Sequence, residues 1–206
     1  MTTSSKRARV VGILFLMAGS AVAGDALESK NVKRLGERVL QYKDDVVQLV
    51  VGYRYAANSL NQKWILFDTY MTPVWNRPLA FQREDFALMT PDGTRLSLPT
   101  QKRFAKDVSD VQRIERLAAI QSDPLEGYFP FRRSSEQIRF FVGPDGGVIR
   151  PELILSTLQM AHGPLYFASP KGKWDPGIYT LVIKNKDVDL KLPLPLGVEG
   201  PLERVK

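Results

Sequence analysis

Residues 175–196 read DPGIYTLVIKNKDVDLKLPLPL, and they carry the clearest strand pattern in the chain. Its first half, Ile178–Ile183, is rich in branched and aromatic side chains, and residues 185–187 supply a turn. In its second half, apolar residues alternate with Asp189, Lys191 and two prolines. Such alternation predicts two antiparallel strands, the second with one face in the core and one in water. Prolines at the outward positions predict an edge strand, because proline has no N–H to offer to a further strand.

The same period of two appears earlier in the chain. From Val47 to Tyr55 every second residue is apolar or aromatic, which predicts a half-buried strand. Runs of branched and aromatic residues predict further strands over 64–71, 79–90 and 137–142. The chain therefore belongs to the mainly β class.

Two segments depart from this period-two pattern. Ser109 and Gln112 fit a capping box, and the apolar residues at 111, 114, 117 and 118 share one face, so we predict a helix over 109–121. Residues 148–162 fit either a strand or a helix that opens at Pro151, and we favour a short helix.

The spacing Asp175-x-Gly177-x-Tyr179 resembles the tyrosine corner of immunoglobulin-like sandwiches. The resemblance implies an immunoglobulin-like antiparallel sandwich with one or two short helices inserted, in which the Tyr179 hydroxyl bonds to upstream backbone. It also suggests Trp64 as the counterpart of the buried tryptophan of that family. The chain departs from true immunoglobulin domains in having no cysteine. The fold by itself selects no function.

The N-terminal 23 residues have the pattern of a secretory signal peptide. Three cations lie among residues 6–9, an apolar stretch runs from Val10 to Ala23, and Ala21-Val22-Ala23 is a small-x-small cleavage site. The apolar stretch is shorter than the roughly 20 residues that cross a bilayer. We therefore expect cleavage before Gly24, a single β-sandwich domain over 24–206, and a soluble periplasmic or secreted protein. The lack of cysteine favours a bacterial source.

Charge and composition make several classes of chemistry improbable. The formal net charge is +7, and the three cations of residues 6–9 leave +4 for the mature chain. Such a chain is weakly attracted to anionic surfaces, and we expect no specific nucleic-acid binding. Zinc sites need several His or Cys ligands, and His162 is the only histidine. We expect no metal, no cofactor and no catalytic triad at His162, and phosphate-binding glycine motifs are absent.

The most suggestive surface for binding is aromatic and basic. Aromatic faces and cations together suit polyanions or carbohydrates, although aromatic side chains in such a run more often close the core. The candidate residues are Tyr128, Phe129, Phe131, Arg132, Arg133 and, separately, Trp174.

Two functions remain open from the sequence. The first is a non-catalytic exported binding or accessory protein of the bacterial cell envelope, with an unknown envelope protein or glycan as its partner. The second is a secreted polysaccharide hydrolase, which would use two carboxylates that the sequence does not pair.

Overall fold

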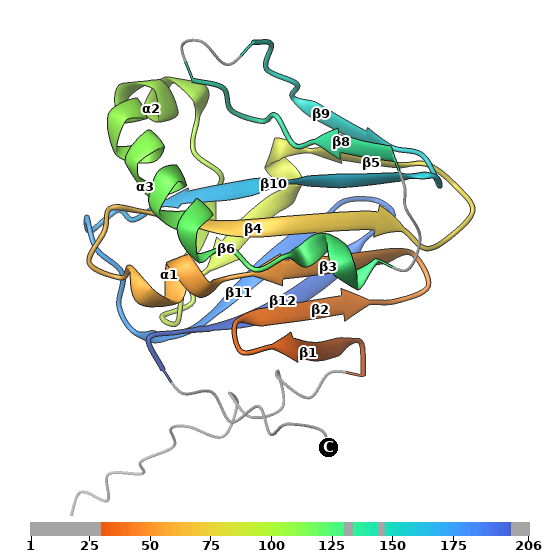
Figure 1. Cartoon of the computed structure of the whole chain (residues 1–206), viewed down its shortest axis with the longest axis horizontal. Helices are drawn as coiled ribbons and strands as arrows, with labels where there is room; N and C mark the ends of the chain where they lie inside the picture. The colour runs from red at the N-terminus through yellow and green to blue at the C-terminus, as the bar shows by residue number, and fades with distance from the viewer. Residues whose placement is uncertain (1–29, 130–133, 144–146, 199–206) are drawn as a thin grey trace, which may run out of the picture.

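The computed structural model describes residues 30–129, 134–143 and 147–198, and it is mainly β, with the layers of a sandwich and short helices (Figure 1). The front layer is a six-stranded sheet in the order β1-β2-β3-β4-β10-β8. Its strands are β1 Val32–Gly36, β2 Val39–Lys43, β3 Val47–Gly52, β4 Trp64–Pro73, β10 Gln159–Ala168 and β8 Ser134–Gln137.

The second layer is a four-stranded antiparallel sheet in the order β12-β11-β6-β7, and Figure 1 shows it behind the first. Its strands are β12 Asp189–Leu196, β11 Gly177–Lys184, β6 Phe86–Met89 and β7 Arg95–Ser97. The predicted hairpin of the C-terminal stretch is confirmed, with Ile183 opposite Leu190, and β12 is an edge strand. Pro193 and Pro195, expected in water, are buried.

A third, small sheet pairs β5, Leu79–Gln82, with β9, Glu152–Leu155. The strand predicted over 79–90 is thus divided by a 3-10 turn, η1 Arg83–Asp85, and its two halves join different sheets.

Three α-helices lie in the described part of the chain: α1 Arg54–Asn58, α2 Gln101–Lys106 and α3 Val108–Gln121. The predicted helix over 109–121 is confirmed as α3. Its apolar face is buried through Val111, Ile114 and Ala118. The residue that caps the start of α2 is Thr100, whose side chain accepts from the Arg103 N–H at 3.2 Å. Within the ranges described, no helix has both the length and the hydropathy of a membrane span.

The main core lies between the two large sheets, and two smaller clusters lie on the outer face of the six-stranded sheet. Successive residues of β4 show the division: Ile65 and Phe67 belong to the main core, whereas Trp64 and Leu66 belong to an outer cluster under α3. Trp64 packs edge-on to Phe104 at 6.2 Å. It therefore does not occupy the place between the sheets that the resemblance suggested.

Two local predictions are wrong. Residues 148–162, all of which the structure describes, contain no helix. They supply β9 and the start of β10, because Leu153, Leu155 and Ala161 each complete the main core. The strand expected over 137–142 instead covers 134–137, where β8 pairs in parallel with β10. The predicted signal peptide, residues 1–23, lies outside the described residues.

Candidate functional site

The described aromatic residues of the predicted binding surface belong to two separate clusters. Tyr128 ends the 3-10 turn η2 Leu125–Tyr128, and its carbonyl accepts from Gln48 Nε2 at 3.4 Å. Phe129, 8% exposed, packs with Val50 and Met160 on the outer face of the six-stranded sheet. Phe129 thus closes a hydrophobic cluster.

Trp174 is 5% exposed and packs edge-on to Tyr179 at 5.8 Å. Trp174 lies in the loop that follows β10, and the last residue of β10 is opposite Trp64, at the start of β4. Tyr128 is bonded to Gln48, which is opposite Thr72, near the end of β4. Eight residues of one strand span about 26 Å, so these clusters lie near opposite ends of β4. Phe131, Arg132 and Arg133 lie outside the described residues.

A charged residue that the sequence did not indicate lies between the two outer clusters. Asp68 follows Leu66 on the outer face of β4 and precedes Tyr70; Leu66 belongs to the cluster under α3, and Tyr70 to the cluster under η2. The backbone neighbours of Asp68 are Gly52 on β3 and Pro164 on β10, which have little or no polar side chain. Among the described residues, Asp68 makes no hydrogen bond and no ion pair.

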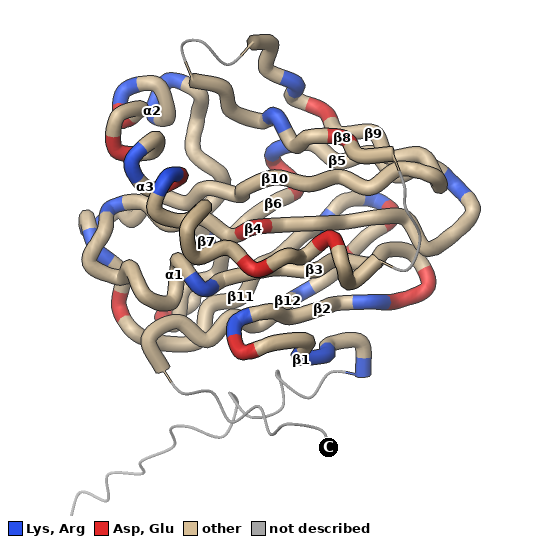
Figure 2. The backbone as a smooth tube through the Cα atoms, in the orientation of Figure 1, with Lys and Arg blue, Asp and Glu red and all other residues tan. Residues whose placement is uncertain are grey.

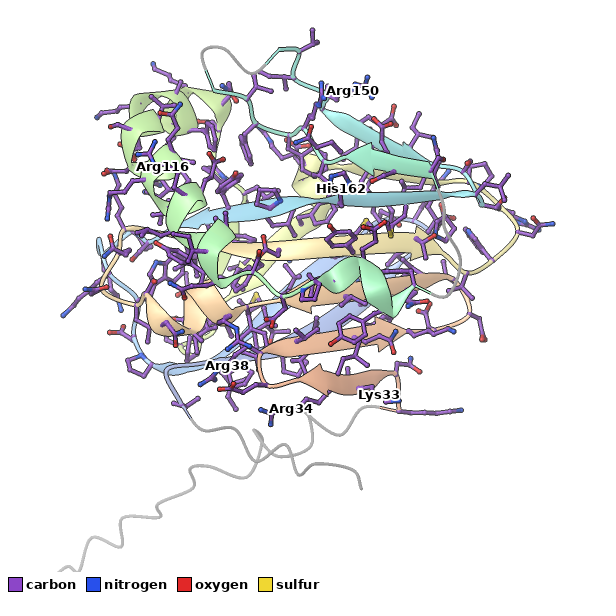
Figure 3. All side chains as sticks on the ribbon, viewed as in Figure 1. Lys33, Arg34, Arg38, Arg116, Arg150 and His162 are labelled. Atoms are coloured by element: carbon purple, nitrogen blue, oxygen red, sulfur yellow. The ribbon has the colours of Figure 1, made fainter. Side chains whose placement is uncertain are left out.

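Aromatic side chains adjoin Asp68 on one side. Tyr70 contacts Phe129 at 6.3 Å and His162 at 5.6 Å between ring centroids. Figure 3 labels His162, which is opposite Tyr70 in the register of β10 and β4. The imidazole Nδ1 of His162 is hydrogen-bonded to Ser135 Oγ at 2.6 Å.

A close crossing of the chain places Ser135 beside His162. Gly163 has φ +150°, and a Cβ atom there would meet the Ile138 Cβ at 3.1 Å. The Ile138 N–H donates to the His162 carbonyl at 2.8 Å. Because only glycine tolerates this approach and this φ, Gly163 allows β8 and the residues after it to run along β10.

On its other side, Asp68 is next to the cluster under α3, to which Leu66 belongs. The Tyr166 hydroxyl donates to Glu115 of α3 in a short hydrogen bond. A cavity of about 180 Å³ borders this pair; its lining includes Pro164, the register partner of Asp68, and one cation, Arg139, but not Asp68 itself. We call Asp68, Tyr70, Glu115, His162 and Tyr166 the Asp68 patch.

The electrostatics of the Asp68 patch are acidic in a basic chain. Burial, and then the charge of Asp123, raise the pKa of Asp68 to about 6. Asp123 itself accepts from Arg54 at 3.0 and 3.3 Å, so that cation is already engaged. Burial, and then Glu115 and Asp68, raise the pKa of Tyr166. Figure 2 shows acidic positions on β4 and along the chain between α3 and η2.

The Asp68 patch is suited to hold a positively charged group. A half-buried carboxylate attracts a cation strongly because little water screens it, and the faces of tyrosine rings attract cations as well. Period-two patterning could have placed Asp68 on a strand beside Leu66 and Tyr70. It could not have shown that the register partners of Asp68, Gly52 on β3 and Pro164 on β10, supply no cation.

Comparison of this chain with protein-family models, with curated proteins and with solved structures found no match.

Proposed function

We propose that this chain is an exported, non-catalytic binding or accessory protein of the bacterial cell envelope, and that it holds a cationic group of its partner at the Asp68 patch. The observation that carries the proposal is the half-buried Asp68 carboxylate, for which the described residues provide no partner. Proteins avoid burying an unpaired charge because desolvation is costly, so such a group is retained where it serves a site. The signal-peptide pattern of residues 1–23 supports export.

We further propose that the sandwich is immunoglobulin-like. The Tyr179 hydroxyl donates to the Asp175 carbonyl at 2.8 Å, the contact that a tyrosine corner makes, and this supports the resemblance. The parallel pairing of β8 with β10 is a departure from that family's antiparallel sheets.

Capture from an envelope extract tests the binding function. The full chain would be produced with its own N-terminus in a bacterium, purified from the periplasm, and used to capture proteins and glycans from an envelope extract of its source. We expect a mature N-terminus at Gly24 by mass spectrometry, and a saturable partner that wild-type protein retains and Asp68→Asn loses.

The matched control is Asp45→Asn, which removes the same charge from an exposed position at the turn before β3. It should leave capture unchanged. Equal capture by wild type and Asp68→Asn would overturn the assignment of the Asp68 patch. Retention of the chain in the cytoplasm with residues 1–23 intact would overturn export.

One observation favours the polysaccharide hydrolase as a second candidate. A carboxyl group with a pKa of about 6 suits a general acid, and Glu115 offers a second carboxylate in the lining of the cavity that includes Pro164, the register partner of Asp68. Shortening of a captured glycan by wild type, but not by Asp68→Asn, would favour the hydrolase over the binding protein.

A further inference from the structure

A second pocket lies at one end of the sandwich, away from the Asp68 patch. It encloses about 270 Å³ between the turn at 90–94, which joins β6 to β7, and the loop at 169–175, which joins β10 to β11. The loop at 169–175 begins five residues after Pro164, which is opposite Asp68. Five residues of extended chain span about 16 Å, so the pocket is separated from the Asp68 patch by about that distance along β10. Its apolar walls are Pro91, Leu96, Pro170, Trp174 and Tyr179.

Hydrogen bonds within both loops fix the shape of the pocket. Asp92 accepts from the Thr94 N–H at 3.1 Å and from the Thr90 hydroxyl. In the facing loop, Ser169 Oγ accepts from the backbone N–H of Lys171 at 3.1 Å. The backbone N–H of Trp174 donates to the Leu60 carbonyl at 2.7 Å. A pocket held in this way loses little conformational entropy when a ligand binds.

The wall of the pocket contains a donor without an acceptor. Trp174 is 5% exposed, and its indole Nε1 is closed off from solvent and has no hydrogen-bond partner within the described residues. Trp64, by contrast, donates from Nε1 to Asp107 at 3.0 Å. Buried donors are paired in nearly all native structures, so an unpaired one beside a pocket gains an acceptor if a small turn of the indole brings Nε1 to the polar group of an occupant.

The charges around the pocket balance. Lys171 Nζ lies 3.3 Å from Asp175 Oδ2 and 3.9 Å from Asp92 Oδ2, so two carboxylates share one ammonium group. Lys173 is exposed and restores neutrality. A polyanion would need a surplus of cations and a cationic ligand a surplus of carboxylates, and neither is present in this lining.

We propose that this pocket binds one neutral sugar residue of a polysaccharide. A sugar ring has apolar C–H faces for the aromatic and proline walls, and hydroxyl groups that both accept from Trp174 and Lys173 and donate to Asp92 or Asp175. The volume lies just below the roughly 300–1,000 Å³ of pockets for drug-sized ligands, which suits a single ring. This site is independent of the Asp68 patch and goes beyond the function proposed there.

The test is a titration of the ¹⁵N-labelled protein with glucose, galactose, mannose and N-acetylglucosamine, and with the charged sugars glucuronate and glucosamine. We expect at least one neutral sugar to shift the Trp174 indole N–H resonance saturably and to leave that of Trp64 in place. Loss of one hydrogen bond in Trp174→Phe should weaken binding about tenfold.

Trp75→Phe is the matched control, because the Trp75 Nε1 also has no partner in the described part of the chain but does not line this pocket. It should bind as wild type does. Lys173→Gln changes an exposed side chain, is expected to fold, and should also weaken binding. The proposal is overturned if no neutral sugar shifts the Trp174 resonance, if glucuronate or glucosamine binds more tightly, or if both tryptophan variants bind equally well. The capture experiment with Asp68→Asn does not depend on any of these outcomes.

Discussion

Asp68 lowers the stability of the folded chain at neutral pH. Its folded pKa of about 6 lies above the ordinary 3.8, so the folded state prefers the neutral form. Stability is therefore unaffected below about pH 4, falls as the pH rises towards 6, and stays reduced above it. At about 1.4 kcal/mol per pKa unit, the cost at pH 8 is up to about 3 kcal/mol.

Asp68→Asn is accordingly expected to unfold at a higher denaturant concentration than wild type at pH 8 and at the same concentration at pH 4. Urea unfolding at both pH values measures the difference, with Asp45→Asn as the control that should show none. A loss of stability at pH 8 would mean that Asp68 has a cationic partner. A gain in stability together with a loss of capture would be the sign of a residue kept for binding.

The Tyr179 hydroxyl is a second residue with a separable effect. Tyr179→Phe keeps the buried ring and removes the hydrogen bond to the Asp175 carbonyl, so unfolding should become easier by about 1 kcal/mol. Tyr128→Phe is the matched control, because the half-buried Tyr128 hydroxyl bonds to no described residue. A change equal to that of the control would remove the best support for a tyrosine corner.

At the scale of elements, Asp107 joins the helices to the sheet. It lies between α2 and α3, and accepts from Lys63 Nζ at 2.5 Å and from Trp64 Nε1 at 3.0 Å. The hydrogen bond from Lys63 is the main reason why the pKa of Asp107 is lowered, so its contribution is lost only as the pH falls below the ordinary range of a carboxyl.

Asp107→Ala leaves the buried Trp64 N–H without an acceptor and should destabilise the chain by about 2 kcal/mol at pH 7. Asp110→Ala, in the exposed first turn of α3, should cost no more than about 0.5 kcal/mol. Chemical unfolding of both variants measures the difference, and equal effects would show that Asp107 does not anchor the helices.

The elements that the sequence predicted correctly are those in which the local pattern of apolar residues is enough to distinguish a strand from a helix. The hairpin of β11 and β12 and the helix α3 each bury a regular apolar face, so the period was sufficient. The predicted capping box at Ser109 and Gln112 is wrong, because α3 begins at Val108 after Asp107, which makes no side-chain capping bond. By contrast, β8 reads Ser-Ser-Glu-Gln and has no apolar pattern; it is a strand only because β10 offers a free edge. Residues 148–162 have apolar side chains that fit both periods, and pairing with β5 and β4 decides between them.

At the scale of the whole molecule, the candidate sites come from residues that lie far apart in the sequence. The Asp68 patch needs β4, α3 and β10, and the sugar pocket needs two loops about 80 residues apart. Sequence patterning described each strand, but it contained no information on which faces meet. It selected Trp174 and Phe129 by residue type, and both belong to clusters whose packing only the assembled fold defines.

The edge of the four-stranded sheet leads to a prediction about association. Pro193 and Pro195 are two residues apart on β12, so both missing N–H groups lie on the side away from β11. Replacing both with threonine restores donors on the open edge, and we expect concentration-dependent dimers or larger species by size-exclusion chromatography with light scattering. Thr180→Val, within the paired strand β11, is the control that should stay as wild type does.

The pairing of β4 with β10 also determines when the molecule can be completed during synthesis. Trp64 lies opposite Ala168, so the centre of the six-stranded sheet joins segments about 100 residues apart. Until the ribosome has made residue 168, β4 has one edge without a neighbour. A chain that stops before β10 therefore carries an open, apolar strand and is the form of this protein most exposed to proteases and to self-association.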